Sequence, residues 1–244
     1  MALTAEATLL YGPFKSSRFG ATISVDLGVQ EGTLAVSRTN RMPRASVVVT
    51  TAAREVMRLS KAGDKAESLV VFGSVATPTA HPDFLEITEN LRDLRNKWYS
   101  KAKLVLVAQT PLVEEYSVRR SMEIYDRVII RIDWGTAKLF SSMTGRKTTE
   151  LTQLAKTLSS LDKIVVETTF QRGKYDNSTA AELRNWIKRV QELTPIELHV
   201  SNLHDKVTGQ KPVPPARMKE LVAEATEKIG VPVTVLEQAD PLLT

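Results

Sequence analysis

Residues 163–202 read KIVVETTFQRGKYDNSTAAELRNWIKRVQELTPIELHVSN, and the order of patterns in this segment indicates the fold class. Its first part, Lys163–Phe170, is rich in β-branched residues and predicts a strand. The middle part, Ser178–Glu192, repeats apolar residues at helical spacing after the cap candidate Asn177. The last part, Ile196–Asn202, predicts a second strand. A strand, a helix and a strand in this order form a parallel unit with a right-handed crossover.

The same alternation extends over the rest of the chain. Further strands are predicted at Ala21–Leu27, Ser68–Phe72, Lys103–Gln109, Arg127–Asp133 and Val231–Leu236. Helical spacing fills the intervals at Thr51–Lys61, Asp83–Trp98, Glu114–Ile124, Thr136–Met143 with Glu150–Leu161, and Pro215–Lys228. This order predicts an α/β fold with parallel strands, either a partial TIM-like (β/α)6 barrel or a doubly wound sheet. Because no linker or composition shift divides the chain, we expect a single domain over residues 1–244.

Composition excludes several classes of chemistry. The 244 residues are 42% hydrophobic and 25% charged, which is typical of a soluble globular protein. The chain has no cysteine, so it cannot form disulfides, ligate zinc or an iron–sulfur cluster through its own thiolates, or use a cysteine nucleophile. With only three histidines, no metal site is predicted. The first ten residues lack the features of a signal peptide and the apolar runs are strand length, so we expect a cytoplasmic protein without membrane contact.

One face of the predicted strands is polar, whereas a parallel strand buried on both sides is apolar throughout. The polar side chains of that face are Asp26, Gln109, Arg131, Asp133, Glu167, Thr169, His199 and Ser201. Unpaired charges are costly to bury, so we expect a solvated lumen or a paired polar network that binds a ligand. The alternative is an ordinary solvent-facing side of the sheet. His199 is more simply a hydrogen-bonded structural histidine than a catalytic base, and we assign no catalytic residue.

Basic residues follow several of the predicted strands. Between Gly32 and Arg54 there are four arginines and no acidic residue, and the net charge of the chain is +5. In a barrel, the loops that follow the strands gather on one face. The candidate anion-binding residues of this basic mouth are Arg18, Arg38, Arg41, Arg44, Arg172 and Lys174. Three interpretations stay open: a phosphate or nucleic-acid surface, docking to an acidic protein, and ordinary solvated charge. Trp134, at a strand end, is expected to face this mouth, where it either stacks on a base or ring or plugs the barrel.

Several collinear fragments resemble the radical S-adenosylmethionine (radical SAM) superfamily, in particular its wyosine-synthase-like group. They include YGPFKSSRFGATISVDL at Tyr11–Leu27, VFGSVATPTAHPD at Val71–Asp83 and IDWGTAKLF at Ile132–Phe140. Similar fragments continue to residue 217, so the resemblance covers nearly the whole chain in order. It implies a partial (β/α)6 barrel whose site lies at the carboxyl ends of the strands.

The chain departs from that resemblance at both cofactor elements. In the superfamily, the loop after the first strand carries three cysteines that hold an iron–sulfur cluster, whereas Gly28–Arg44 here reads GVQEGTLAVSRTNRMPR. The superfamily's Gly-Glu pair, which holds the methionine amino group, falls on Ala76 and Thr77. We therefore expect no cofactor and no radical SAM chemistry.

Three functional hypotheses follow from these residues. The first is a cluster-lacking, radical-SAM-like subunit that regulates or supports a protein partner. The second, compatible with the first, is a protein that binds RNA through the basic mouth. The third is a non-radical enzyme or small-molecule-binding protein that uses the polar lumen.

Overall fold

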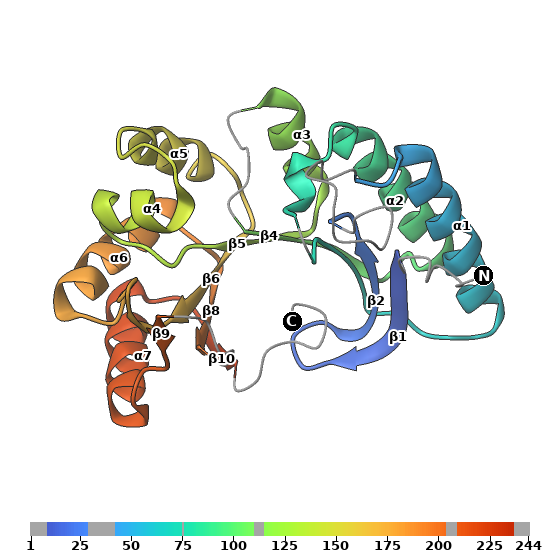
Figure 1. Cartoon of the computed structure of the whole chain (residues 1–244). Coiled ribbons are helices and arrows are strands. Elements are labelled where there is room, and N and C mark those ends of the chain that lie inside the picture. The colour runs from blue at the N-terminus through green and yellow to red at the C-terminus, as the bar shows by residue number, and fades with distance from the viewer. Residues whose placement is uncertain (1–8, 29–41, 75, 110–114, 204–208, 237–244) are drawn as a thin grey trace, which may run out of the picture. The chain divides into compact units, whose positions relative to one another are not determined.

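The computed structural model describes residues 9–28, 42–74, 76–109, 115–203 and 209–236. The chain divides into two compact units, with the boundary between Val128 and Ile129. Among the described residues the predicted fold class is confirmed. It is an α/β fold whose mostly parallel sheet has the strand order β1-β2-β3-β4-β5-β6-β8-β10 (Figure 1). This architecture agrees with a partial TIM-like barrel.

The described residues of the first unit form four strands and three α-helices. Its elements are β1 (Leu10–Ser16), β2 (Gly20–Asp26), α1 (Ala45–Lys61), β3 (Ser68–Phe72), the short 3₁₀ helix η1 (Pro78–Ala80), α2 (Phe84–Trp98), β4 (Lys103–Ala108) and α3 (Tyr116–Ile124). Strands β2, β3 and β4 pair in parallel, with Val25 opposite Val71 and Val71 opposite Leu106. These three side chains are fully buried, so they form the center of this unit's core.

Strand β1 was not predicted from the sequence. It pairs antiparallel with β2, so the unit opens with a hairpin rather than with a loop. The register shifts between Tyr11 and Phe14, where the chain reads Gly12-Pro13. These two residues are typical of a turn, and the strand around them forms because β2 lies beside it. Helix α1 also begins earlier than predicted, at Ala45 instead of Thr51.

The second unit repeats the strand–helix order. Strand β5 (Arg127–Arg131) crosses the boundary and is followed by α4 (Ala137–Thr144), α5 (Glu150–Leu158), β6 (Ile164–Phe170), β7 (Arg172–Gly173), α6 (Ala180–Leu193), β8 (Glu197–Asn202), β9 (Gln210–Lys211), α7 (Pro215–Ile229) and β10 (Val233–Leu236). Strand β8 lies between β6 and β10 and is parallel to both. The short strands β7 and β9 pair antiparallel in a separate ribbon.

Helix α6 shows how local sequence sets an element. Its N-cap is Thr179, whose hydroxyl accepts a hydrogen bond from the Glu182 amide at 3.2 Å. The prediction that Asn177 caps this helix is therefore wrong. Its side-chain amide forms other hydrogen bonds instead. The buried side of the helix carries Leu183, Trp186 and Val190, at the expected spacing.

In the described part of the chain, no helix has the length and hydropathy needed to cross a membrane.

Candidate functional site

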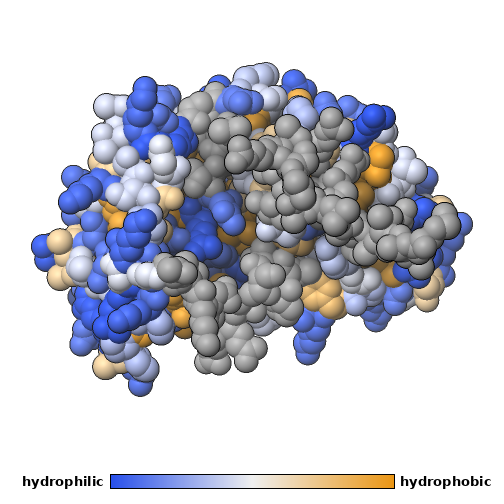
Figure 2. Space-filling model, viewed as in Figure 1, coloured by the Kyte–Doolittle hydropathy of each residue, from blue (hydrophilic) through white to orange (hydrophobic). Residues whose placement is uncertain are grey.

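The polar residues predicted for β5, β6 and β8 do come together in the second unit. Glu167 lies opposite His199 and Thr169 opposite Ser201 in the parallel β6–β8 register. On the other side of β6, the Ile132 amide donates to the Glu167 carbonyl, which places Arg131 and Asp133 beside these residues. Figure 2 shows hydrophilic residues gathered over β5 and β6. We call Arg131, Asp133, Glu167, Thr169, Glu197, His199, Ser201 and Thr234 the polar face.

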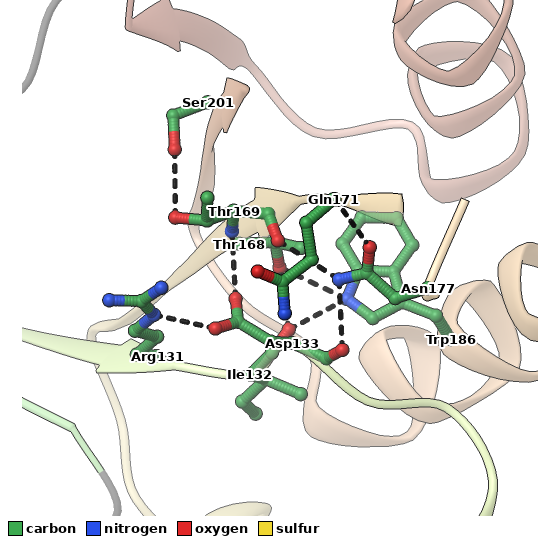
Figure 3. A network of polar contacts seen from close by, with 9 residues as sticks. All are labelled: Arg131, Ile132, Asp133, Thr168, Thr169, Gln171, Asn177, Trp186 and Ser201. Atoms are coloured by element: carbon green, nitrogen blue, oxygen red, sulfur yellow. Dashed lines mark hydrogen bonds and ion pairs between the residues drawn. The ribbon is translucent and has the colours of Figure 1, made fainter. Parts of the chain in front are cut away.

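Asp133 joins the end of β5 to β6. One of its carboxylate oxygens accepts a hydrogen bond from the Thr169 amide at 2.7 Å, and the other accepts from Nε of Arg131 at 2.6 Å (Figure 3). The carboxylate is buried, whereas the Arg131 side chain is 38% exposed. The ion pair therefore places a partly exposed guanidinium over a buried anion. Arg131 remains the more accessible of the two groups for a ligand.

Burial raises the pKa of Asp133 above its ordinary value of 3.8, and the charge of Arg131 and the Thr169 amide only partly oppose this effect. A group whose pKa is higher in the folded state contributes stability at low pH, and that contribution falls as the pH rises through its folded pKa. Asp133→Asn keeps an acceptor for the Thr169 amide but does not titrate.

We therefore expect the wild type to lose stability relative to Asp133→Asn as the pH rises from 3.8 through the folded pKa. Urea unfolding of both proteins at several pH values measures this difference. The exposed Asp93→Asn serves as the control, because its partner Arg92 is also on the surface. A stability difference that does not change with pH would show that the folded pKa of Asp133 is not raised.

Asn177 ties three backbone segments together behind Asp133. Its Nδ2 donates to the carbonyl oxygens of Asp133 and Thr169, both at 2.9 Å, and its Oδ1 accepts from the Gln171 amide at 2.8 Å. Figure 3 shows this amide between the ends of β5 and β6. All of its hydrogen bonds go to backbone, and it is buried. Asn177 is thus a positioning residue that fixes the two strand ends carrying the polar face.

Trp186 of α6 completes this arrangement. Its Nε1 donates to the Ile132 carbonyl and to Oγ1 of Thr168, each at 3.0 Å. Thr168 in turn donates to the same carbonyl at 2.7 Å. The indole also packs edge-on against Phe170, with ring centroids 5.4 Å apart. The tryptophan therefore connects the apolar core to the backbone at Ile132, directly before Asp133.

His199 lies deeper in the polar face and is 3% exposed. Its Nε2 lies 3.2 Å from Oε1 of Glu197, and the Thr234 hydroxyl donates to the same oxygen at 3.0 Å. The hydroxyls of Thr169 and Ser201 lie 2.9 Å apart. His199 is buried and contacts Glu197 of its own strand. It is therefore a structural histidine rather than a solvent-exposed group.

Asp26 lies in the first unit, at the end of β2, and is fully buried. One carboxylate oxygen accepts from the Gly28 amide at 2.8 Å and from the Ser74 amide at 3.0 Å. Its second oxygen, and the hydroxyl of Ser24 two residues earlier, have no hydrogen-bond partner among the described residues. Burial and the charge of Asp26 raise the pKa of Tyr11. Gln109, which follows β4, is exposed.

His81 holds the other end of the segment that begins at Gly28. Its Nδ1 accepts a hydrogen bond from the Asp83 amide at 3.0 Å, so Nε2 carries the proton and donates to the Pro43 carbonyl at 2.7 Å. The chain on both sides of residues 29–41 is therefore fixed by side chains outside that interval.

The predicted basic residues do not all share a location. Arg38 and Arg41 lie outside the described residues. Arg18 lies in the turn between β1 and β2, beside the Phe19 ring, at the amino end of β2. Arg18 therefore does not lie with the basic residues that follow the strands, and its role in anion binding stays a prediction. Arg44 is exposed at the start of α1, and Arg172 and Lys174 are exposed after β6.

Sequence reasoning left two roles open for Trp134 and missed one surface feature. Trp134 is 3% exposed and packs edge-on against Phe140, with centroids 4.8 Å apart, so it does not offer a stacking surface. The aromatic residue six positions later was the signal for this contact. The missed feature is the β7–β9 ribbon, where Arg172 lies directly opposite Lys211. Gly173 and Gly209 were its sequence signal, since both adopt positive φ.

Comparisons with known proteins give structural but not sequence relatives. No protein-family model and no curated protein matches the chain. Among solved structures, a radical SAM methyltransferase from Sphaerobacter thermophilus has a TM-score of 0.59 and 13% identity. That match covers 88% of this chain, which spans 66% of the methyltransferase. A domain of the pyruvate-formate lyase-activating enzyme from Bacteroides vulgatus has a TM-score of 0.47 and 12% identity, over 63% of this chain and 93% of that one. The methyltransferase match shows that the two chains share a fold.

Proposed function

We propose that the protein is a radical-SAM-like subunit without radical chemistry of its own, which acts by binding an anionic partner, RNA. The observation that carries this proposal is a radical SAM fold in a chain without a single cysteine. Membership of the wyosine-synthase-like group, a regulatory or scaffold role for a protein partner, and a location in the cytoplasm belong to the same proposal. The collinear fragments from Tyr11 to residue 217 support the first of these.

The residues present do not fit an iron–sulfur cluster. Thiolates are the usual ligands of such clusters, and the segment from Gly28 to Arg44 contains neither cysteine nor histidine. In the structure, Gly28 packs directly on Gly73 and Ala76: a Cβ at Gly28 would lie 2.7 Å from Cα of Gly73 and 2.9 Å from the Ala76 amide nitrogen. The described residues contain no group of three or more ligating side chains that could hold a metal ion. We derive no reaction step through a cluster.

Anaerobic reconstitution with iron and sulfide tests this part of the proposal. We expect less than a stoichiometric amount of bound iron, and no 5′-deoxyadenosine when S-adenosylmethionine and dithionite are added, because the chain supplies no thiolate. A cysteine-bearing radical SAM enzyme treated in parallel is the control. One cluster per chain would overturn the proposal.

The proposed RNA partner is supported by charge. The chain carries +5 net charge, and cationic side chains follow the strand ends that the superfamily uses as its functional face. Arg172 and Lys174 are exposed there, and neither pairs with a carboxylate within the described ranges. Cations without local partners favour a polyanion whose bound counterions are released on binding.

A second candidate function is the binding of a small polar molecule on the polar face. The specific observation is that six of the eight predicted lumen residues lie on one face of β5, β6 and β8. Native mass spectrometry of the freshly purified protein, compared with its denatured mass, would reveal such a ligand. An unmodified mass in both states would count against this candidate.

A further inference from the structure

We propose that the β7–β9 ribbon is the element that grips the RNA backbone, through Arg172, Lys174 and Lys211. This inference deepens the proposed function and rests on it. The ribbon consists of Arg172–Gly173 and Gln210–Lys211, paired antiparallel and separate from the main sheet. It extends the chain beyond the carboxyl ends of β6 and β8.

The first step is the unfavourable charge arrangement within the ribbon. Arg172 and Lys211 are direct cross-strand partners, and like charges in that position destabilise a pair of strands. Lys174 follows within two residues, and its amide donates to the Gly209 carbonyl, which continues the same pairing. Three exposed cations on so short a ribbon repel one another. An anion with several charges removes that repulsion.

The second step is that these cations lack local anions. On the helices, arginines lie beside carboxylates: Arg58 beside Glu55, Arg92 beside Asp93, and Arg217 beside Glu220. In the described part of the chain, Arg172, Lys174 and Lys211 form no such pair. Asp176 is the nearest acid in sequence, and one of its oxygens accepts from the amide and the hydroxyl of Ser178.

The third step is that hydrogen bonds hold both strands of the ribbon at their bases in the absence of a partner. Asn177 holds the Gln171 amide at the start of β7. Asn202 holds the end of β9: its Oδ1 accepts from the Val213 amide at 2.8 Å and its Nδ2 donates to the Val213 carbonyl at 2.9 Å. Each strand of the ribbon is thus fixed at its base by an asparagine, so binding orders little additional backbone.

The fourth step is the geometry of the arginine. Nε of Arg172 donates to the Pro212 carbonyl at 3.1 Å, which orients the guanidinium across the ribbon. Its terminal nitrogens keep four N–H donors, which suit two oxygens of one phosphate. Lys174 lies over the Tyr175 ring, 5.0 Å from its centroid, so an aromatic surface adjoins the cations. Cations next to an aromatic ring favour a nucleic-acid strand over an acidic peptide.

The experiment measures binding of fluorescein-labelled oligouridylate by anisotropy over a range of salt concentrations. We compare the wild type with the triple variant Arg172→Gln, Lys174→Gln and Lys211→Gln. The charge-matched control replaces Arg184, Lys188 and Lys219, which are exposed on α6 and α7, by glutamine. We expect the ribbon variant to bind about tenfold more weakly or worse, and its plot of log affinity against log salt to be shallower by about 2, from roughly 0.7 per phosphate contact.

The outcomes separate the two proposals. If the wild type does not bind RNA, the proposed function fails and the ribbon inference fails with it. If the wild type binds and the ribbon and control variants weaken equally, only the ribbon inference fails. If polyglutamate displaces the RNA as well as unlabelled oligouridylate does, the surface recognises acidic protein and the inference is overturned. Arg172→Lys adds a finer test: a loss of affinity with the charge retained shows that the planar arginine is needed.

Discussion

Replacing Gly135 by alanine is expected to destabilise the second unit by about 3 kcal/mol or more, because helix α6 packs against this residue without room for a methyl group. An ideal Cβ on Gly135 would lie 2.7 Å from the Glu182 carbonyl oxygen and 2.8 Å from the Asn185 carbonyl carbon, and closer still to the Trp186 amide nitrogen. These are backbone atoms of a helix, so no side-chain rotation relieves the overlap.

The consequence of this substitution reaches the polar face. To accept the methyl group, α6 must move away from the end of β5, and Trp186 would then lose its hydrogen bond to the Ile132 carbonyl. We expect a lower urea midpoint together with a red shift and loss of intensity in the tryptophan fluorescence.

Gly145→Ala is the control for the Gly135 substitution. Gly145 ends α4 with φ of 71° and has open space around it, so alanine there meets only backbone strain of about 1–2 kcal/mol. Equal losses at the two positions would show that α6 does not pack as closely on Gly135 as described.

Asn177→Asp is expected to cost about 3–5 kcal/mol at neutral pH, although the two side chains have the same shape. The carboxylate can still accept from the Gln171 amide, but its other oxygen would face the carbonyl oxygens of Asp133 and Thr169 in place of the Nδ2 donor. A buried charge against two acceptors is far worse than a lost hydrogen bond.

The stability of the Asn177→Asp variant should also depend on pH in a defined direction. In the folded variant, a proton on the new carboxyl group restores one donor, so the folded pKa is raised above the unfolded value. The variant should therefore regain stability as the pH falls through that raised pKa, whereas the wild type lacks this titration. Urea unfolding at several pH values measures the effect.

Asn185→Asp is the matched control for this second substitution. Asn185 donates to the Ala181 carbonyl from the exposed side of α6, so water can solvate the new charge. We expect a change of less than about 1 kcal/mol there. If Asn177→Asp is as mild as Asn185→Asp, Asn177 does not hold the strand ends.

Local sequence was sufficient for the elements that carry their own periodicity. Strand β3 was predicted with the observed bounds, and the alternation of polar and apolar residues in β6 and β8 correctly placed Glu167, Thr169, His199 and Ser201 on one face. The two-residue period of a strand predicts on which face of the sheet a side chain lies, whichever residues it contacts there.

Features that depend on a distant partner were not predictable in the same way. Strand β1 contains Gly12-Pro13 and forms only through its pairing with β2. Asn177 resembles a helix cap in sequence, because nothing local shows that the carbonyl of Asp133, 44 positions earlier, comes to its Nδ2. Register and packing set these contacts, and both emerge only when strands far apart in the chain are assembled.

The fixation of Gly28 and Pro43 has a consequence for protein engineering. Asp26 holds the first of these and His81 the second, and both anchoring side chains belong to the permanent framework of the first unit. The sequence between these two residues can therefore be replaced while the hydrogen bonds at Gly28 and Pro43 are kept, because the side chains that form them lie outside it. A segment with three cysteines could be grafted between these anchors to ask whether cluster assembly needs anything more from this scaffold than the missing thiols.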